Sequence, residues 1–297
     1  MKPAHFALLV AICFMWAMNL VLTRWTVTEV GVPPLFFAGV RVTLLAAILA
    51  PFLLPAPRQL GMMFLIAMGL AGVQFGLLFL GLSLSPAGVA SVIGQLGVPF
   101  TTILSIVFLG EKVGVYRTVG IILAFAGVMI IVIDPSEFAL TVGIIYLVLA
   151  ALVGAIANIL MKRIEPMPAM RLQAWVGLFS ILPLMAMSFL IETKQVDPFV
   201  ALDWRVYAAS IFSVVGVSIF AHGSFYGLIK KYEVTLLSPL TLMTPVMGVI
   251  LGVVLLGEHV TWQMIVGGAM ALAGVGIIGM RRNRRFPEAS VGDKIGP

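Results

Sequence analysis

The chain has 297 residues, of which 61% are hydrophobic and only 10% are charged, against roughly 25% charged residues in an average soluble domain. This composition excludes an ordinary soluble domain, because so much apolar surface cannot all be kept from water in one globular core. The net charge of +6 does not indicate nucleic-acid binding, since the basic residues fall in short connections and a tail rather than on one folded surface.

Apolar stretches long enough to cross a bilayer recur along nearly the whole chain. A hydrocarbon core of about 30 Å needs about 20 helical residues. The stretches lack the alternating pattern of a membrane-spanning barrel, so the predicted fold class is an all-α integral membrane protein. Charges and Pro/Gly punctuation place ten transmembrane helices near residues 6–24, 34–54, 60–82, 86–109, 115–133, 140–161, 170–191, 205–229, 234–256 and 262–280.

Lysine and arginine are unevenly distributed between the two ends of these helices. Fourteen of the 18 fall in connections on one side or in the tail, and only Arg24, Lys194 and Arg205 fall on the other. Because cytoplasmic connections carry the excess of basic residues, both termini are predicted to lie in the cytoplasm. The tail after Met280, which opens on the sequence RRNRR, is expected to be a basic anchor near anionic lipid headgroups.

A motif occurs twice along the chain. One copy has Pro99, Gly110-Glu111, Gly120, Ala124 and Gly127, and the other has Pro245, Gly257-Glu258, Gly267, Ala271 and Gly274. From the Gly-Glu pair onward the two copies are 147 residues apart. Five helices per copy is an odd number, so the second copy is predicted to insert upside down, as an inverted repeat. The expected units are residues 1–137, residues 138–280 and a basic tail of residues 281–297.

The duplicated pattern resembles the drug/metabolite transporter superfamily, in particular its EamA-type ten-helix members, over about residues 6–280. The length and layout are similar to those of bacterial amino-acid exporters, including the aromatic amino-acid exporter. The resemblance implies an inner-membrane exporter that works by alternating access around a central cavity between the two halves. It marks Pro99, Pro245 and the two Gly-Glu pairs as family-pattern positions and assigns no substrate.

Two ionisable residues are expected inside the helices. Arg41 lies about seven residues from the outer end of its predicted helix, roughly 10 Å deep, which is too deep for its side chain to reach water easily. It either binds a substrate carboxylate or satisfies carbonyls of a broken helix. His222 shares a helix face with Ser218, Phe225 and Tyr226, which indicates a substrate wall, a titrating switch or a packing histidine.

Other polar and aromatic residues on predicted inward faces extend the candidate substrate-binding set. These are Trp16, Asn19, Gln74, Phe75, Phe79, Gln95, Asn158 and Trp175, with Arg41, His222, Phe225 and Tyr226 as above. Each has the alternative of bridging or packing helices, as amide side chains do in lipid. Pro99 and Pro245 are the candidate hinges, with a static kink as the alternative.

No carboxylate in the sequence falls at the middle of a predicted span. This pattern favours facilitated diffusion down the substrate gradient and leaves proton-coupled export as the alternative. An intramembrane lipid-modifying enzyme would need a nucleophile, a metal cluster or paired acids, but His5, His222 and His259 are scattered and Cys13 is the single cysteine. We therefore expect no catalytic residue, no metal and no cofactor.

The predicted function is a secondary transporter that exports small amphipathic solutes, amino acids foremost. A receptor, an assembly scaffold and an importer are the remaining alternatives. We expect a monomer in a bacterial-type inner membrane, with a small-molecule substrate and membrane lipid as partners and no nucleic acid.

Overall fold

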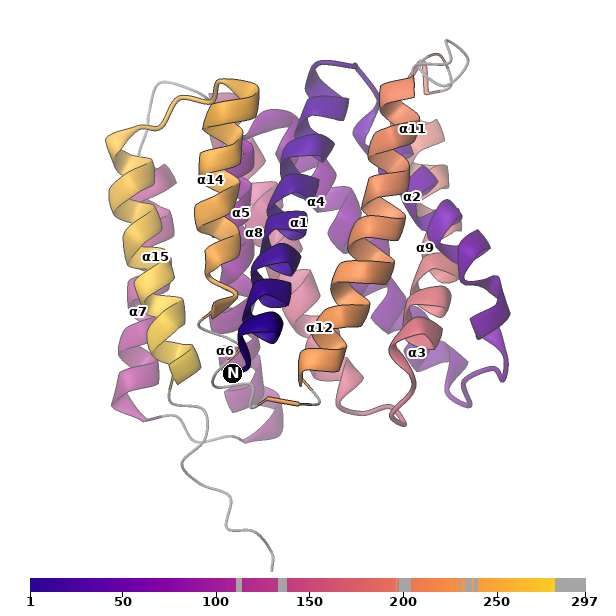
Figure 1. Ribbon diagram of the computed structural model, residues 1–297, viewed down its shortest axis with the longest axis horizontal. Coiled ribbons are helices and arrows are strands. Elements are labelled where there is room, and N and C mark those ends of the chain that lie inside the picture. The colour runs from indigo at the N-terminus through magenta and orange to yellow at the C-terminus, as the bar shows by residue number, and fades with distance from the viewer. Residues whose placement is uncertain are drawn as a thin grey trace, which may run out of the picture.

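The computed structural model describes residues 1–110, 114–132, 138–195, 197, 204–229, 231–232, 237 and 240–280. Every regular element within these residues is a helix (Figure 1), which confirms the all-α fold class. Glu111, the tail of residues 281–297 and the side chain of Tyr226 lie outside the described part.

Seven helical stretches of the described residues are long and apolar enough to cross a membrane. They are α1 (Pro3–Thr28), α3–η2–α4 (Leu60–Ala67, Met68–Gly72, Val73–Leu84), α5–η3–α6 (Ala87–Ile93, Gly94–Leu96, Gly97–Leu109), α8 (Phe138–Met161), α9 (Ala169–Ile191), α11–η4–α12 (Trp204–Ile211, Phe212–Ala221, His222–Ile229) and α15 (Trp262–Met280). Three shorter apolar helices lie among them: α2 (Pro34–Ile48), α7 (Val115–Val132) and α14 (Met243–Leu256). A short 3₁₀ turn, η1 (Ala50–Leu53), follows α2.

The helices form one bundle with two ends (Figure 1). We call the end at which residue 1 lies the lower end and the opposite end the upper end. Helices α7 and α15 pack together at one edge of the bundle, and α2, α3 and α9 form the other edge. Helix α1 lies between these edges and packs on α14.

The small-residue stripes of the repeated motif face each other in the contact of α7 with α15. A side chain added at Gly127 would overlap the backbone of Gly267 and Ala271, and one added at Gly120 would overlap the backbone of Gly274. The spacing of 147 residues converts the pair Gly120–Gly274 into the pair Gly267–Gly127, so the contact maps onto itself. Small residues thus allow close backbone approach, the usual way for helices to associate in lipid.

Three of the long helices are interrupted. Pro99 has no N–H to donate to the Gln95 carbonyl, and just before it the residues Gly94–Leu96 tighten into the 3₁₀ turn η3. The other two breaks are the π-helical segments η2 and η4. They occupy matching places, because 147 residues beyond Met68 is Val215, inside η4. Such π-helical segments frequently mark functional sites.

Pro245, Gly110 and the Gly257-Glu258 pair lie at helix ends. Pro245 is in the first turn of α14, where a missing N–H breaks no helical hydrogen bond. Gly110 ends α6 and Gly257 ends α14, both in the left-handed conformation with φ of 65° and 64°. At these positions a residue with a side chain would be strained, so glycine is the natural helix stop.

Candidate functional site

Arg41 of α2 is buried, with 4% of its surface exposed. Its Nη2 lies 3.4 Å from the Ser218 hydroxyl oxygen in η4, and its guanidinium stands 4.6 Å from the centre of the Phe75 ring. Its Nε is buried and has no hydrogen-bond partner, and no carboxylate within the described residues forms an ion pair with it. An arginine has five N–H donors, so this cation is far from satisfied by its protein contacts.

His222 and Trp16 extend this polar centre toward α1. His222 lies one turn beyond Ser218. Its Nδ1 is 2.8 Å from the Val217 carbonyl, which can only accept, so Nδ1 donates and the neutral ring keeps its lone pair on Nε2. The Trp16 ring lies 5.4 Å from the His222 ring and 5.1 Å from that of Phe225, and the buried indole N–H of Trp16 has no acceptor.

We refer to Arg41, Phe75, Ser218, His222, Trp16 and Phe225 as the Arg41 cluster. It joins α1, α2, α4 and η4–α12, which are far apart in the sequence. It holds two buried polar N–H groups that lack acceptors, one on Arg41 and one on Trp16. Buried donors without acceptors are unfavourable, and such a pair suits a ligand that brings an acceptor.

Two further predicted residues border the cluster. Asn19, one turn beyond Trp16 on α1, accepts a 2.7 Å hydrogen bond from the Ser213 hydroxyl of η4. The Phe79 ring packs 6.1 Å from that of Phe75 and 5.7 Å from that of Phe37. Asn19 thus ties α1 to η4, and the phenylalanines form an apolar wall beside Arg41.

The remaining predicted residues have other surroundings. The Gln74 amide, with its nitrogen turned toward its own helix, donates to the carbonyls of Gly69 and Leu70. Gln95 lies half-buried in η3, and Asn158 is exposed near the lower end of α8. Trp175 donates its indole N–H to the Leu53 carbonyl at 3.1 Å. These residues lie outside the Arg41 cluster, and their predicted role in substrate binding stays a prediction.

Glu258 closes a second polar centre, at the upper end of the bundle. Its carboxylate accepts hydrogen bonds from the amides of Ala87 and Gly88, the first residues of α5, and forms a 3.1 Å ion pair with Nε of Arg24. Arg24 also donates through Nη1 to the carbonyls of Leu82 and Ser85. Glu258 therefore acts both as the cap of α5 and as the ion-pair partner of Arg24.

Glu192 makes a similar cap at the same end. Its two carboxylate oxygens accept the amides of Leu35 and Phe36 at 2.7 and 2.9 Å, and the Ser188 hydroxyl donates to it at 2.6 Å. Each capped helix follows a proline, Pro33 or Pro86, whose side chain has no oxygen with which to cap it. Carboxylates near a helix N-terminus are stabilised by the exposed amides and the helix dipole.

Arg24, Ser213 and Glu192 are functional contacts that the sequence pattern does not predict. Apart from Ser188, their partners lie between 58 and 234 residues away along the chain, so no local pattern points to them. The one available signal is a carboxylate directly after an apolar helix on the side where few charges fall, which Glu192 shares with Glu258.

Comparisons with known proteins agree with the membrane architecture. A family model described as the EamA-like transporter family matches residues 4–133 and 141–280. A protein of Salmonella typhimurium (strain LT2), named "Probable amino-acid metabolite efflux pump", is 31% identical over 299 residues, which cover 95% of this chain and 97% of that protein. A protein of Escherichia coli (strain K12) with the same name is 28% identical over 292 residues, covering 94% and 96%.

A solved crystal structure of a protein shares the fold. It superposes with a TM-score of 0.59 at 16% sequence identity, over 93% of this chain and 96% of that chain.

Proposed function

Because this chain belongs to the EamA-like transporter family, within the drug/metabolite transporter superfamily, we propose that it exports amino acids and related small amphipathic metabolites by alternating access. It is a multi-pass membrane transporter and not an enzyme. The amino-acid specificity is a proposal that the names of the two efflux-pump relatives support.

The proposed architecture has ten transmembrane helices in two inverted repeats, residues 1–137 and 138–280, with a basic tail of residues 281–297. Support comes from the self-matching α7–α15 contact, the π-helical segments at corresponding places and the two glycine helix stops with equal φ. The excess of lysine and arginine in the sequence connections on one side of the predicted helices, the side that includes the N-terminus, supports a cytoplasmic lower end and cytoplasmic termini, in a bacterial-type inner membrane. We propose a monomer as the working unit.

The single observation that carries the substrate proposal is Arg41, a buried cation without a carboxylate partner among the described residues. A charge inside a membrane bundle is unfavourable and is kept where function needs it. A free amino acid brings the missing carboxylate, which can accept from Nε and Nη2 of Arg41 and from the Trp16 indole N–H.

The surroundings of Arg41 support a substrate with an apolar or aromatic side chain. Phe75 contacts Arg41, Phe79 packs on Phe75, and Phe225 packs on Trp16. Aromatic faces pack well against apolar or aromatic side chains. His222 offers a lone pair on Nε2 that could accept from the substrate ammonium group. Trp175, Gln95 and Asn158 would then contact the substrate only along its path.

Alternating access requires the upper end to open and close. We propose that the Arg24–Glu258 ion pair and the two helix caps hold the upper end closed, because the second repeat supplies both carboxylates and the first repeat both helix ends. Pro99 and Pro245 are the proposed hinges, and the 3₁₀ turn η3 before Pro99 supports flexing at that level. When the upper end opens, the ion pair and the two caps break, and water molecules take the place of the lost protein contacts.

The proposed energy source is the substrate gradient itself. The carboxylates Glu29, Glu165, Glu192, Asp197 and Glu258 are at helix ends or in connections, and no carboxylate falls inside a described span. Proton-coupled export is the second candidate, since His222 in the Arg41 cluster is a side chain that can take up and release a proton.

Flux measurements on proteoliposomes test the proposal. Purified full-length protein should release preloaded radiolabelled amino acids with saturable kinetics and without an imposed ion gradient, while protein-free liposomes should not. We would test a panel of amino acids, sugar nucleotides and organic cations. Efflux no faster than from protein-free liposomes would contradict transport of these classes. Flux that appears only with a pH gradient would replace facilitated diffusion by proton coupling.

A further inference from the structure

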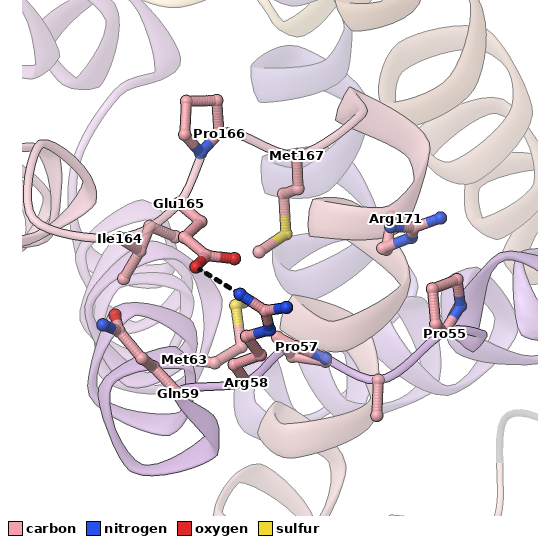
Figure 2. Close-up of a pocket in the computed structure, with 11 residues that line it drawn as sticks. Pro55, Pro57, Arg58, Gln59, Met63, Ile164, Glu165, Pro166, Met167 and Arg171 are labelled. Atoms are coloured by element: carbon pink, nitrogen blue, oxygen red, sulfur yellow. Dashed lines mark hydrogen bonds and ion pairs between the residues drawn. The ribbon is translucent and has the colours of Figure 1, made fainter.

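A cavity of about 410 Å³ opens at the lower end of the bundle, away from the Arg41 cluster (Figure 2). Two connections enclose it, one of residues 55–59 before α3 and one of residues 164–168 before α9. Small-molecule sites commonly measure about 300–1,000 Å³, so this cavity can admit a headgroup but not a long acyl chain.

The cavity walls are amphipathic. Met63, Ile164 and Met167 supply apolar surface, while Arg58, Arg171 and Glu165 supply charge. Figure 2 shows Arg58 directed at Glu165, with a 3.2 Å contact between Nη1 and the carboxylate, and Arg171 on the α9 side of the cavity. Two cations face one anion, so the cavity carries a net positive charge.

The two cations differ in their partners. Among the described residues, Arg171 has no hydrogen-bond or ion-pair partner. The pair Arg58–Glu165 is at the surface, with 84% and 65% of the side chains exposed, and ion pairs in water hold their partners weakly. A stronger anion can therefore displace Glu165 and bind both arginines.

Two helix N-termini add to the positive field. Helix α3 begins at Leu60 and α9 at Ala169, both beside the cavity. Neither has a capping side chain and neither has an acidic residue in its first turn, unlike α2 and α5 with Glu192 and Glu258. The exposed amides at such helix ends favour an anion.

The cavity is rigidly framed before any ligand arrives. Pro55, Pro57 and Pro166 fix the backbone of the two connections. The Trp175 indole holds the start of the first connection through the Leu53 carbonyl. A preformed site loses less entropy when it binds.

We propose that this cavity binds the phosphate group of an anionic amphiphile, with Arg58 and Arg171 as the phosphate ligands and the methionines against its glycerol part. A phospholipid of the adjoining leaflet is the source that the apolar wall favours, because the cavity lies at the end of membrane-spanning helices, at headgroup depth. A soluble phosphate compound shares the chemistry. The site goes beyond the proposed transport function and does not depend on which solute is exported.

Binding is measured by thermal unfolding of the purified full-length protein during titration with short-chain phosphatidylglycerol. Matched titrations use phosphatidylcholine of the same chain length and inorganic phosphate. We expect phosphatidylglycerol to raise the midpoint temperature with saturation and phosphatidylcholine to raise it far less. If inorganic phosphate raises the midpoint temperature as much as phosphatidylglycerol does, the phosphate site is supported and its ligand is a soluble phosphate compound. Equal curves for phosphatidylglycerol and phosphatidylcholine, with no response to phosphate, would overturn the proposal.

Three variants locate the effect. The double variant Arg58→Gln/Arg171→Gln should weaken phosphatidylglycerol binding at least tenfold, while Arg163→Gln, which removes a cation at the same end outside the cavity, should leave it unchanged. Glu165→Gln removes the competing carboxylate and should tighten binding several-fold. Weaker binding in Glu165→Gln, or unchanged binding in the double variant, would contradict the site. No transport is measured, so this result is separate from the test of export.

Discussion

Arg24 and Arg41 are both arginines inside the helical bundle, but their surroundings are opposite. Arg24 at the upper end meets the Glu258 carboxylate and two backbone carbonyls. Arg41, deeper and 4% exposed, meets one serine hydroxyl at 3.4 Å and the face of an aromatic ring. A position inside the bundle alone therefore does not distinguish a structural cation from a functional one.

The number of acceptors around each guanidinium makes that distinction. A buried charge with a carboxylate and carbonyl acceptors contributes to a closed structure, and removing its partner is strongly unfavourable. A buried charge without an anion makes the folded protein less stable than a neutral side chain would. The second arrangement is expected where a ligand supplies the anion during the working cycle.

The largest expected effect is on Arg41. Arg41→Gln should lower amino-acid flux at least 100-fold while the midpoint temperature of unfolding stays the same or rises, because an unpaired buried charge has been removed. Flux and thermal unfolding of the same preparation measure both, with Arg163→Gln as the exposed control. Retained flux, or a large loss of stability, would make Arg41 a structural residue like Arg24.

The reverse pattern is expected for the Arg24–Glu258 pair. Glu258→Gln removes the carboxylate charge that Arg24 contacts directly and should destabilise the protein by about 2–4 kcal/mol. Arg24→Gln should destabilise by a similar amount, and the double variant by less than the sum of the two, which a double-mutant cycle of unfolding measurements detects. Additive effects would mean that the two side chains do not interact.

Trp16→Phe tests the second unpartnered donor of the Arg41 cluster. The change keeps an aromatic ring against His222 and Phe225 but removes the indole N–H, so stability should change by less than about 1 kcal/mol. Flux of amino acids should fall about tenfold if that N–H binds the substrate, which equals about 1.4 kcal/mol. Phe225→Leu serves as a packing comparison, and an unchanged flux in Trp16→Phe removes Trp16 from the binding set.

The smallest effect is expected for Glu192, which caps a helix and forms no ion pair within the part of the chain that the structure describes. Glu192→Gln keeps oxygen and loses charge, so it should destabilise by about 1 kcal/mol, the usual size for a helix cap. The comparison is made by measuring the thermal unfolding of Glu192→Gln and Glu258→Gln under the same conditions. A loss as large as that of Glu258→Gln would show that capping, and not the ion pair, dominates at the upper end.

Much of the fold could be predicted from the sequence because hydropathy alone specifies helices in a membrane. The repeated glycines were also readable in the sequence, and Gly120, Gly127 and their counterparts meet in the structure. The Gly257-Glu258 pair was correctly placed at a helix end. The partner of Glu258 could not be predicted from the sequence, because ion pairs across the bundle join residues far apart in the chain.

The candidate site was predictable only in outline. The depth of a residue in the membrane and its helix face can both be estimated from sequence spacing. For this reason the grouping of Arg41, His222, Trp16 and Phe225 could be predicted. Trp175 has the right composition for a cavity wall, yet it contacts the Leu53 carbonyl near the lower end, since the turn η1 extends the chain beyond α2. Periodicity indicates a helix face but not which neighbour that face meets.

Competition between an amino acid and its carboxamide tests the role of Arg41 most directly. The amide keeps the side chain and the ammonium group of the amino acid and lacks only the carboxylate charge. Unlabelled phenylalanine should inhibit flux through the wild-type protein at concentrations at least tenfold below the inhibitory concentrations of phenylalaninamide. The residual flux through Arg41→Gln should be inhibited equally by the two compounds. Equal inhibition in the wild-type protein, or undiminished preference in Arg41→Gln, would contradict carboxylate recognition by Arg41.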